Sequence, residues 1–381
     1  MKITPFRATY ANFRHIPSPD DFCEAAKFQF NEYVQTGAME QFPQAAFYIY
    51  QIEGRQHRRH TGLIALDAIA DFLNGRVKMH EKTLREKEEQ QMALFLRWNA
   101  VLKPVLLTHS PVPALDRWLQ AFADQHKPLF TVRFAKSGQV HRVWAVSDPT
   151  DIAHLQGLFA EQVGRVYIAD GHHRTTTMAL LHEQYGQQPG DYDFEHLFCA
   201  FFSTDQLDIL DYNRVVEAPA ELSPLHLMVQ LSKIFDLERL EEAQKPTQKH
   251  EVTLLLRKEW YRLRWRKEVL EQPLQQTVLL DASLLNELVL RDLLGIEDVR
   301  TDQRITYIDG SKGIKGMEKM VKNGPNRLGF LLYPVSFDDL RQLADAGESL
   351  PPKSTYFEPR IRSGVLVQSL VKEGGTGLST L

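Results

Sequence analysis

The spacing of apolar residues changes between helical and strand-like periods along the whole chain, which predicts a mixed α/β protein. Residues that are apolar at every third or fourth position predict helices over 13–37, 83–98, 113–123, 150–162, 175–185, 225–234, 282–294, 316–323 and 337–346. Short apolar, β-branched or aromatic runs predict strands over 45–51, 61–66, 104–108, 130–134, 141–146, 165–169, 197–203, 252–256, 261–265 and 326–332. Three consecutive strand pairs, which begin at residues 45, 130 and 252, are expected to form hairpins.

A Pro-punctuated stretch at residues 216–224 divides this pattern into two parts. The chain has 381 residues, which is the size expected of two domains. We therefore predict an N-terminal α+β domain over residues 1–215, elaborated by its first 60 residues, and an additional C-terminal α+β domain over 216–381. The final loop of the second domain is expected to pack back towards the core.

Composition narrows the class of protein. Hydrophobic residues make up 43% of the chain and charged residues 25%, as in ordinary globular proteins. The net charge of −4 does not favour a surface that coats nucleic acid. Cys23 and Cys199 lie far apart and have no partner at metal-ligand spacing, which argues against a disulfide scaffold or a structural zinc site. The start of the chain lacks a signal-peptide pattern, and no apolar run reaches the roughly 20 residues of a membrane span. We expect a cytoplasmic protein without a membrane partner.

The segment 166–181 carries the most informative chemistry. An apolar strand runs into Asp170-Gly171, where the glycine permits a sharp turn close to a ligand, and a helix follows at once. The first turn of a helix offers unpaired N–H groups and the positive end of the helix dipole. The guanidinium of Arg174 is suited to phosphate oxygens, and the adjacent histidines add donors and acceptors. We predict an anion site formed by Gly171, His172, His173, Arg174 and Thr175.

Two simpler interpretations of this segment stay open. Asp-Gly before a helix is often only a turn with a capped helix start, and paired histidines are often surface residues. A zinc site is disfavoured, because the side chains of the adjacent His172 and His173 cannot easily share one metal ion and no further ligand stands at the usual spacing.

Four segments of the chain carry a resemblance to a known family. They are residues 5–7, 78–83, 170–174 and 350–360. On these segments the chain resembles the domain-of-unknown-function 1015 family of bacteria and archaea along nearly its whole length. Residues 169–174 also look like the signature of the ParB/sulfiredoxin superfold, in which a Gly-x-x-Arg element at a helix start grips nucleotide phosphates. The resemblance implies an α+β fold with a ParB/sulfiredoxin-like core.

The same resemblance implies an activity. Free-serine kinases of this superfold use a carboxylate from about the region of residues 80–83 as the base on the substrate hydroxyl, so Glu81 is the first candidate for a general base, with His80 beside it. Asp170 is the second candidate, or a ligand of Mg²⁺. ATP or ADP with Mg²⁺ would then donate a phosphoryl group to a small hydroxyl compound such as serine. The alternative for Glu81 is a solvated acid favoured by a helix start.

Two further segments hold candidate ligand contacts. Arg214 follows a strand and could bind an anion or form an ion pair between the domains. Lys353, Ser354 and Thr355 lie on a Pro-stiffened loop that could close over the phosphates or the substrate, or could lock the C-terminal domain to the core.

Three other functions compete with a kinase. Sulfiredoxin chemistry needs a cysteine beside the arginine, where this chain has His172 and His173. A ParB-like DNA-associated protein needs a helix-turn-helix and a basic face, so nucleic acid is not an expected partner. A non-catalytic nucleotide-binding regulator is the main rival, because a phosphate cradle can bind without reacting. The expected partners are a nucleotide and a small-molecule substrate, and a homodimer stays open.

Overall fold

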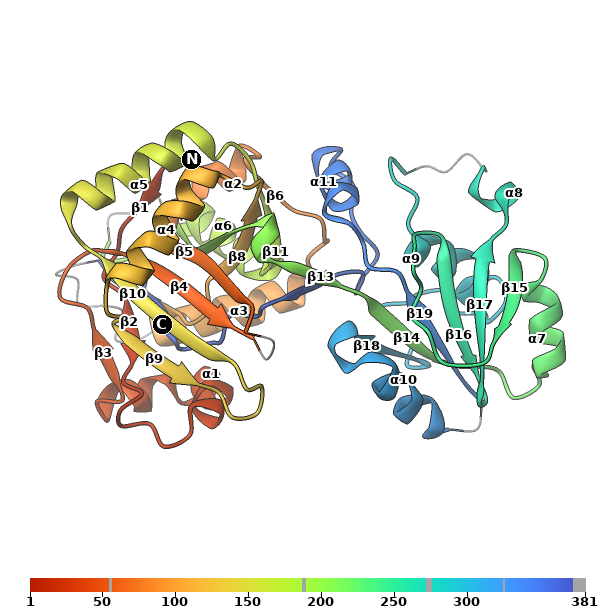
Figure 1. The fold of residues 1–381 in the computed structure, drawn as a ribbon. Helices are drawn as coiled ribbons and strands as arrows, with labels where there is room; N and C mark the ends of the chain where they lie inside the picture. Colours follow the sequence, from red (N-terminus) through yellow and green to blue (C-terminus); the bar gives the residue numbers. More distant parts are fainter. Residues whose placement is uncertain (55–56, 187–189, 272–275, 325, 373–381) are drawn as a thin grey trace. The chain divides into compact units, whose positions relative to one another are not determined.

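The structure, a computed structural model, describes residues 1–54, 57–186, 190–271, 276–324 and 326–372. The chain forms two compact units (Figure 1). The first unit consists of Met1–Asp208 together with Pro359–Leu381, and the second unit is the continuous segment Ile209–Glu358. Among the described residues, no helix has both the length and the apolar character needed to cross a membrane.

A nine-stranded sheet forms the centre of the described part of the first unit. Its strands follow the order β6-β11-β8-β12-β5-β4-β10-β9, with β1 paired to β5. The central strands β4, β5 and β12 are buried almost continuously along their lengths, which shows that both faces of the sheet are covered. The strand bounds are β1 Ile3–Thr4, β4 Phe47–Glu53, β5 Arg59–Ala68, β6 Val77–Lys78, β8 Val105–His109, β9 Phe130–Arg133, β10 Val140–Val146, β11 Val166–Asp170 and β12 His196–Ser203.

The helices of the first unit begin where the sequence provides start signals. Pro19, Pro113 and Pro149 each occupy the first turn of a helix, where the missing N–H costs nothing. The side chains of Ser18 and Asp148 cap two of these helices by accepting from backbone N–H groups. The bounds are α1 Pro19–Gln35, α2 Ile69–Leu73, α3 Arg85–Trp98, α4 Pro113–Gln125, α5 Pro149–Gln162 and α6 His172–Tyr185. Helices α4 and α5 pack together, and α6 packs against both α2 and α3.

A smaller four-stranded sheet joins the early strands of the chain to a strand from the last part of the described chain. Its order is β3-β2-β21-β7, with β2 Thr9–Ala11, β3 Met39–Gln41, β7 Ala100–Val101 and β21 Leu366–Ser369. Strand β21 comes from the last part of the described chain, and it pairs with β2 on one side and β7 on the other. This pairing is why residues 359–372 belong to the first unit.

The pairing of β6, β11 and β8 decides which loops surround the start of α6. Strands β6 and β11 are parallel, so the residues that follow β6 and those that follow β11 leave the sheet at the same edge. Strand β8 is antiparallel to β11, which brings the residues before β8 to that edge as well. The ladder between β8 and β11 shifts register between Ile168 and Asp170. Three loops that are distant in sequence therefore meet there.

The second unit is built on a six-stranded antiparallel sheet of order β15-β17-β16-β19-β14-β18. Two apolar clusters lie on the sheet, one around α7 and the segment 281–291, the other around α10. The main sheet contains β14 Tyr212–Glu217, β15 Phe235–Leu240, β16 Glu251–Leu256, β17 Glu259–Trp265, β18 Ile305–Asp309 and β19 Arg327–Leu332. A short pair joins β13 Asp208–Leu210 to β20 Tyr356–Glu358. The helices are α7 Pro224–Leu231, α8 Lys267–Leu270, α9 Asp281–Leu284, α10 Gly313–Lys322 and α11 Phe337–Asp345.

The structure divides the chain differently from the prediction of 1–215 and 216–381. Strand β14 lies between β18 and β19, so residues 212–215 belong to the second sheet and the first crossing comes at Asp208. The segment from Pro359 onwards returns to the first unit. The predicted helix 282–294 is also different, because α9 continues as a π-helix over Leu285–Arg291. The mixed α/β composition with several sheets agrees with the predicted α+β class.

Candidate active site

Gly171 forms the turn between β11 and α6. Its φ of 118° is a left-handed conformation that residues with a Cβ rarely adopt. A Cβ at this position would also lie 2.7 Å from Nη2 and 3.1 Å from Cζ of Arg174. The guanidinium of Arg174 therefore folds back over the turn, and only glycine leaves room for it.

The substitution Gly171→Ala is expected to lower the free energy of unfolding by about 1–3 kcal/mol, because it adds backbone strain and displaces the Arg174 guanidinium. Gly157→Ala is the matched control: Gly157 lies inside α5 and an added Cβ meets no atom within 4 Å. The control should be neutral or slightly stabilising, since alanine favours a helix. Thermal unfolding followed by circular dichroism measures both changes. Equal melting temperatures for Gly171→Ala and the unsubstituted protein would show that the turn is tolerant.

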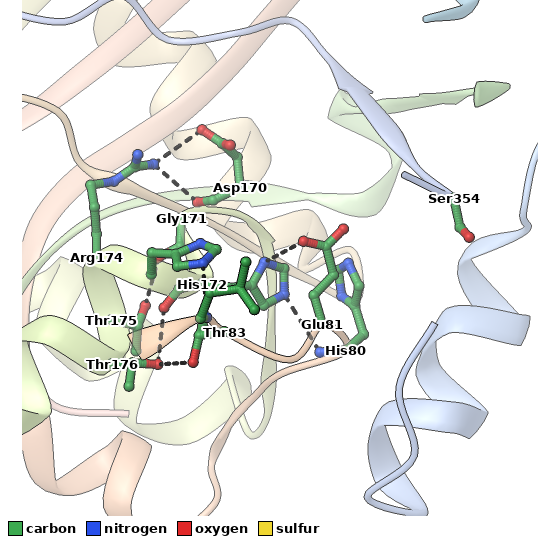
Figure 2. A network of polar contacts seen from close by, with 12 residues as sticks. His80, Glu81, Thr83, Asp170, Gly171, His172, Arg174, Thr175, Thr176 and Ser354 are labelled. Carbon is green, nitrogen blue, oxygen red and sulfur yellow. Dashed lines mark hydrogen bonds and ion pairs between the residues drawn. The ribbon is translucent and has the colours of Figure 1, made fainter. Parts of the chain in front are cut away.

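Asp170 is held between the cationic side chains of Lys103 and Arg174. Figure 2 shows the contact with Arg174. Its Oδ2 accepts hydrogen bonds from Nζ of Lys103 at 2.7 Å and from Nη2 of Arg174 at 3.0 Å. Burial acts to raise the pKa of Asp170, but the charges of Lys103 and Arg174 outweigh it and hold that pKa well below its usual value. Asp170 is thus ionised at neutral pH and would be a weak proton acceptor.

Lys103 and Arg174 join the start of β8 to the start of α6. Arg174 Nη2 also donates to the backbone oxygens of Pro104 and Asp170, both at 3.3 Å. Burial lowers the pKa of Lys103, Asp170 raises it, and the positive charges of Arg174 and Arg360 lower it further. Arg360 belongs to the segment that returns to the first unit. The side chains of Lys103, Asp170 and Arg174 are called the cation cluster below.

His172 and His80 form a buried pair beside the cation cluster. Their rings meet edge to face with centroids 4.4 Å apart, and both residues are at most 5% exposed. His172 Nε2 accepts from the backbone N–H of His80 at 3.5 Å. Burial lowers the pKa of His172 to about 3 and that of His80 well below its usual value, so both rings are neutral at neutral pH. Their contacts join the loop after β6 to the start of α6, and a catalytic role for His80 stays a prediction.

Glu81 follows His80 and lies beside His172 at the start of α6. Its Oε2 lies 3.6 Å from Nδ1 of His172, which carries the ring proton because Nε2 accepts. The Glu81 side chain is 33% exposed. Further along the same loop, the backbone N–H of Leu84 donates to Nε2 of His173 at 3.2 Å. His172 and His173 therefore join the loop 80–84 to α6, and the phosphate contact predicted for them stays a prediction.

Thr175 is not placed to meet a ligand. Its side chain is fully buried, and its hydroxyl donates to the backbone oxygen of Gly171 at 3.3 Å. Thr176 makes the equivalent bond to the backbone oxygen of His172 and lies 3.5 Å from the hydroxyl of Thr83. These bonds stabilise the first turn of α6 and its contact with the loop after β6.

A magnesium site built on Asp170 does not fit this arrangement. One carboxylate oxygen already accepts from two cationic side chains, and a divalent cation beside them would be repelled. Within the described ranges, no three His, Cys, Asp or Glu side chains gather as metal ligands. We therefore assign Asp170 no metal.

The remaining predicted contacts lie in the second unit, whereas α6 lies in the first. Arg214 is fully buried, its Nη1 donates to the Tyr212 backbone oxygen at 2.6 Å, and burial lowers its pKa to about 10.

Lys353 has a left-handed φ of 56° and places its ammonium 5.6 Å from the centre of the Tyr212 ring. Ser354 donates to the Pro351 backbone oxygen, and Thr355 is 9% exposed. Their roles as ligand contacts stay predictions.

Sequence reasoning missed Lys103 and gave Arg360 no role. Lys103 directly precedes Pro104 and a strand, a pattern that has no functional meaning by itself. Arg360 ends one of the four segments that carried the family resemblance, which was the only signal available for it.

Solved structures with a related arrangement were found at low similarity. C-terminally truncated SbnI from Staphylococcus aureus has a TM-score of 0.42 and 13% identity, covering 79% of this chain and 85% of that one. A free serine kinase in complex with AMP has a TM-score of 0.40 and 13% identity, covering 81% and 92%. A conserved hypothetical protein from Pyrococcus furiosus has a TM-score of 0.37 and 12% identity, covering 79% and 93%.

Comparison of sequences identifies the family. Among curated proteins no match was found. The family described as "Protein of unknown function (DUF1015)" matches residues 9–284, which is more than half of the chain and confirms the predicted family. The chain therefore belongs to the DUF1015 family.

Proposed function

We propose that the protein binds ATP or ADP at the start of α6 and transfers a phosphoryl group to a small hydroxyl compound, with serine as the first acceptor to test. The observation that carries the proposal is the pairing of β11 with both β6 and β8, which brings Glu81 and the cation cluster to the same helix start. Phosphoryl transfer needs positive charge at the phosphates and a group that orients the attacking hydroxyl. We include in the proposal a ParB/sulfiredoxin-like core for the first unit.

The proposed roles follow from charge and protonation. Arg174 and the N–H groups of the first turn of α6 bind the phosphates. Glu81 accepts the hydroxyl proton while the acceptor oxygen forms a bond to the terminal phosphorus. The bond between that phosphorus and the bridging oxygen breaks, and the nucleotide leaves with the electron pair and one phosphoryl group fewer. Asp170 is excluded as the base, because its low pKa makes it a poor proton acceptor.

Replacing Arg174 with Ala is expected to weaken nucleotide binding by more than about tenfold, because a charge-assisted contact is worth roughly 1.5–3 kcal/mol. Arg117→Ala is the matched control, since Arg117 is an exposed arginine on α4 of the same unit. Isothermal titration calorimetry with ATP and ADP measures both variants. An unchanged affinity in Arg174→Ala, with the fold intact by circular dichroism, would remove the site.

Nucleotide turnover separates a kinase from a regulator that binds without reacting. Purified protein is incubated with ATP, ADP and CTP, each with and without a panel of hydroxyl amino acids, and both the nucleotide product and the phosphorylated acceptor are measured. A kinase consumes nucleotide and yields a phosphorylated acceptor in equal amounts. Binding without consumption for every acceptor would favour the regulatory function.

A further inference from the structure

Lys103 presents unused hydrogen-bond donors beside the proposed phosphate site. A lysine ammonium has three N–H donors. Within the described chain, Lys103 makes one hydrogen bond, to Oδ2 of Asp170, and its side chain is only 21% exposed. An ammonium that is largely removed from water and has donors to spare is ready to bind an anionic oxygen.

Arg174 adds to this set of donors. Its three hydrogen bonds to described residues all leave from Nη2, and they fix the guanidinium plane against Pro104 and Asp170. Its Nε is buried and has no partner among the described residues. The bonds of Nη2 therefore hold the Arg174 guanidinium in place, while its Nε–H donor has no partner among the described residues.

The charge of the cation cluster also points to an anion. Lys103 and Arg174 share one carboxylate, so the three side chains together carry a net charge of +1. The positive charge of Arg360 adds to the potential at Lys103 and Asp170. Burial lowers the pKa of His80 and His172, so these two rings contribute no charge at neutral pH. An excess of positive charge in a partly buried site favours an anionic group such as a terminal phosphate.

We infer that Lys103 binds a phosphate of the donor nucleotide beyond the α-phosphate, and that Asp170 is the positioning residue that aims Lys103 at it. The inference rests on the proposed function and adds the residue that recognises a nucleoside diphosphate or triphosphate against a monophosphate. Lys103 supplies a point charge that can follow the phosphoryl group, whereas Arg174 is fixed in its plane. Asp170 holds both cations within one site and keeps their mutual repulsion from separating them.

The test compares nucleotides that differ only in the number of phosphates. The affinities of AMP, ADP and ATP are measured by calorimetry for the unsubstituted protein, Lys103→Met, Lys103→Arg and the control Lys127→Met, an exposed lysine of the same unit. Lys103→Met should weaken the binding of ADP and ATP at least about tenfold and leave the affinity for AMP within about twofold of the unsubstituted protein. Lys103→Arg, which keeps the charge, should retain most of the preference for ADP over AMP. Lys127→Met should change none of these affinities.

The outcomes separate this inference from the proposed function. If the unsubstituted protein binds none of the three nucleotides, the proposed function fails. If it binds them but Lys103→Met leaves the ratio of ADP to AMP affinity unchanged, the proposed function stands and Lys103 does not contact the outer phosphates. If circular dichroism shows that Lys103→Met is unfolded, Lys103→Gln is measured in its place. Its ratio of ADP to AMP affinity then decides whether Lys103 contacts the outer phosphates.

Asp170→Asn tests the positioning role. Asp170 raises the pKa of Lys103, so its removal should make Lys103 lose its proton at a lower pH. The preference for ADP over AMP should therefore decline at lower pH in Asp170→Asn than in the unsubstituted protein. A merely structural role for Asp170 would weaken AMP and ADP alike and leave the midpoint of the pH profile unchanged, and that result would overturn the assignment.

Discussion

Replacing Glu81 with Gln is expected to lower phosphoryl transfer at least about a hundredfold, the usual scale for loss of a general base. Glutamine keeps the size and hydrogen bonding of the side chain beside His172 but cannot accept the hydroxyl proton. Because Glu81 does not belong to the cation cluster, the affinity for ADP should remain within about twofold. The turnover number and the calorimetric affinity are measured on the same preparation.

The control for this variant is Glu161→Gln, an exposed carboxylate on α5 of the same unit. It should leave both turnover and affinity unchanged. A Glu81→Gln protein that binds ADP and reacts at the original rate would show that Glu81 is not the base, while a loss of both activity and binding would indicate a role in nucleotide binding.

Replacing Asp67 with Asn should change the dependence of stability on pH. Asp67 lies on β5, is fully buried, and has no hydrogen-bond partner for either carboxylate oxygen among the described residues. Burial, followed by the charge of Asp71, raises the pKa of Asp67 from 3.8 to about 8. An ionised carboxylate at this position is costly, and asparagine removes that cost.

The free energy of unfolding falls as the pH rises, because the folded chain holds the Asp67 proton more tightly than the unfolded chain does. Below pH 3.8 the carboxyl is protonated in both the folded and the unfolded chain. Between that value and about pH 8 the unfolded chain releases its proton and the folded chain keeps it, so the free energy of unfolding falls as the pH rises. Above about pH 8 the whole loss is present. At about 1.4 kcal/mol per pKa unit, the loss between about pH 5 and about pH 8 is about 4 kcal/mol.

Melting temperatures of the unsubstituted protein and Asp67→Asn, measured from about pH 5 to about pH 9, test this expectation. The difference in favour of Asp67→Asn should grow with pH and reach about 10 °C. Asp124→Asn, on the surface of α4, is the control and should show no such trend. Parallel pH profiles for Asp67→Asn and the unsubstituted protein would show that Asp67 titrates normally in the fold.

Local sequence patterns were enough to find the centre of the candidate site. Residues 170–174 are contiguous, so the turn, the helix start and the arginine could be predicted together from one segment. The strands of the hairpins at 45–66 and 130–146 were also predictable, since each has a strong apolar pattern and a short connection. Neighbours in sequence can therefore show the position of the turn and of the helix start, and anion binding there stays a prediction.

Contacts between distant segments were beyond such patterns. Lys103 meets Asp170 across 67 positions only because β8 pairs with β11, and pairing between separate strands is not encoded in either strand alone. The contacts of His172 and His173 with the loop 80–84 could not be predicted for the same reason. The two-residue strand β6, which sets the position of Glu81, is too short to give a periodic signal.

The return of the chain to the first unit sets the order in which the molecule can be completed during its synthesis. A ribosome makes the whole of Ile209–Glu358 before it makes β21, so the second unit has its full sequence available first. Strands β2, β3 and β7 are translated early, but their sheet stays incomplete until β21 has been made, because β21 lies between β2 and β7. Arg360 arrives with the same late segment. A nascent chain that stops within the second unit therefore lacks both the strand that closes the first unit and one of the positive charges at its candidate active site.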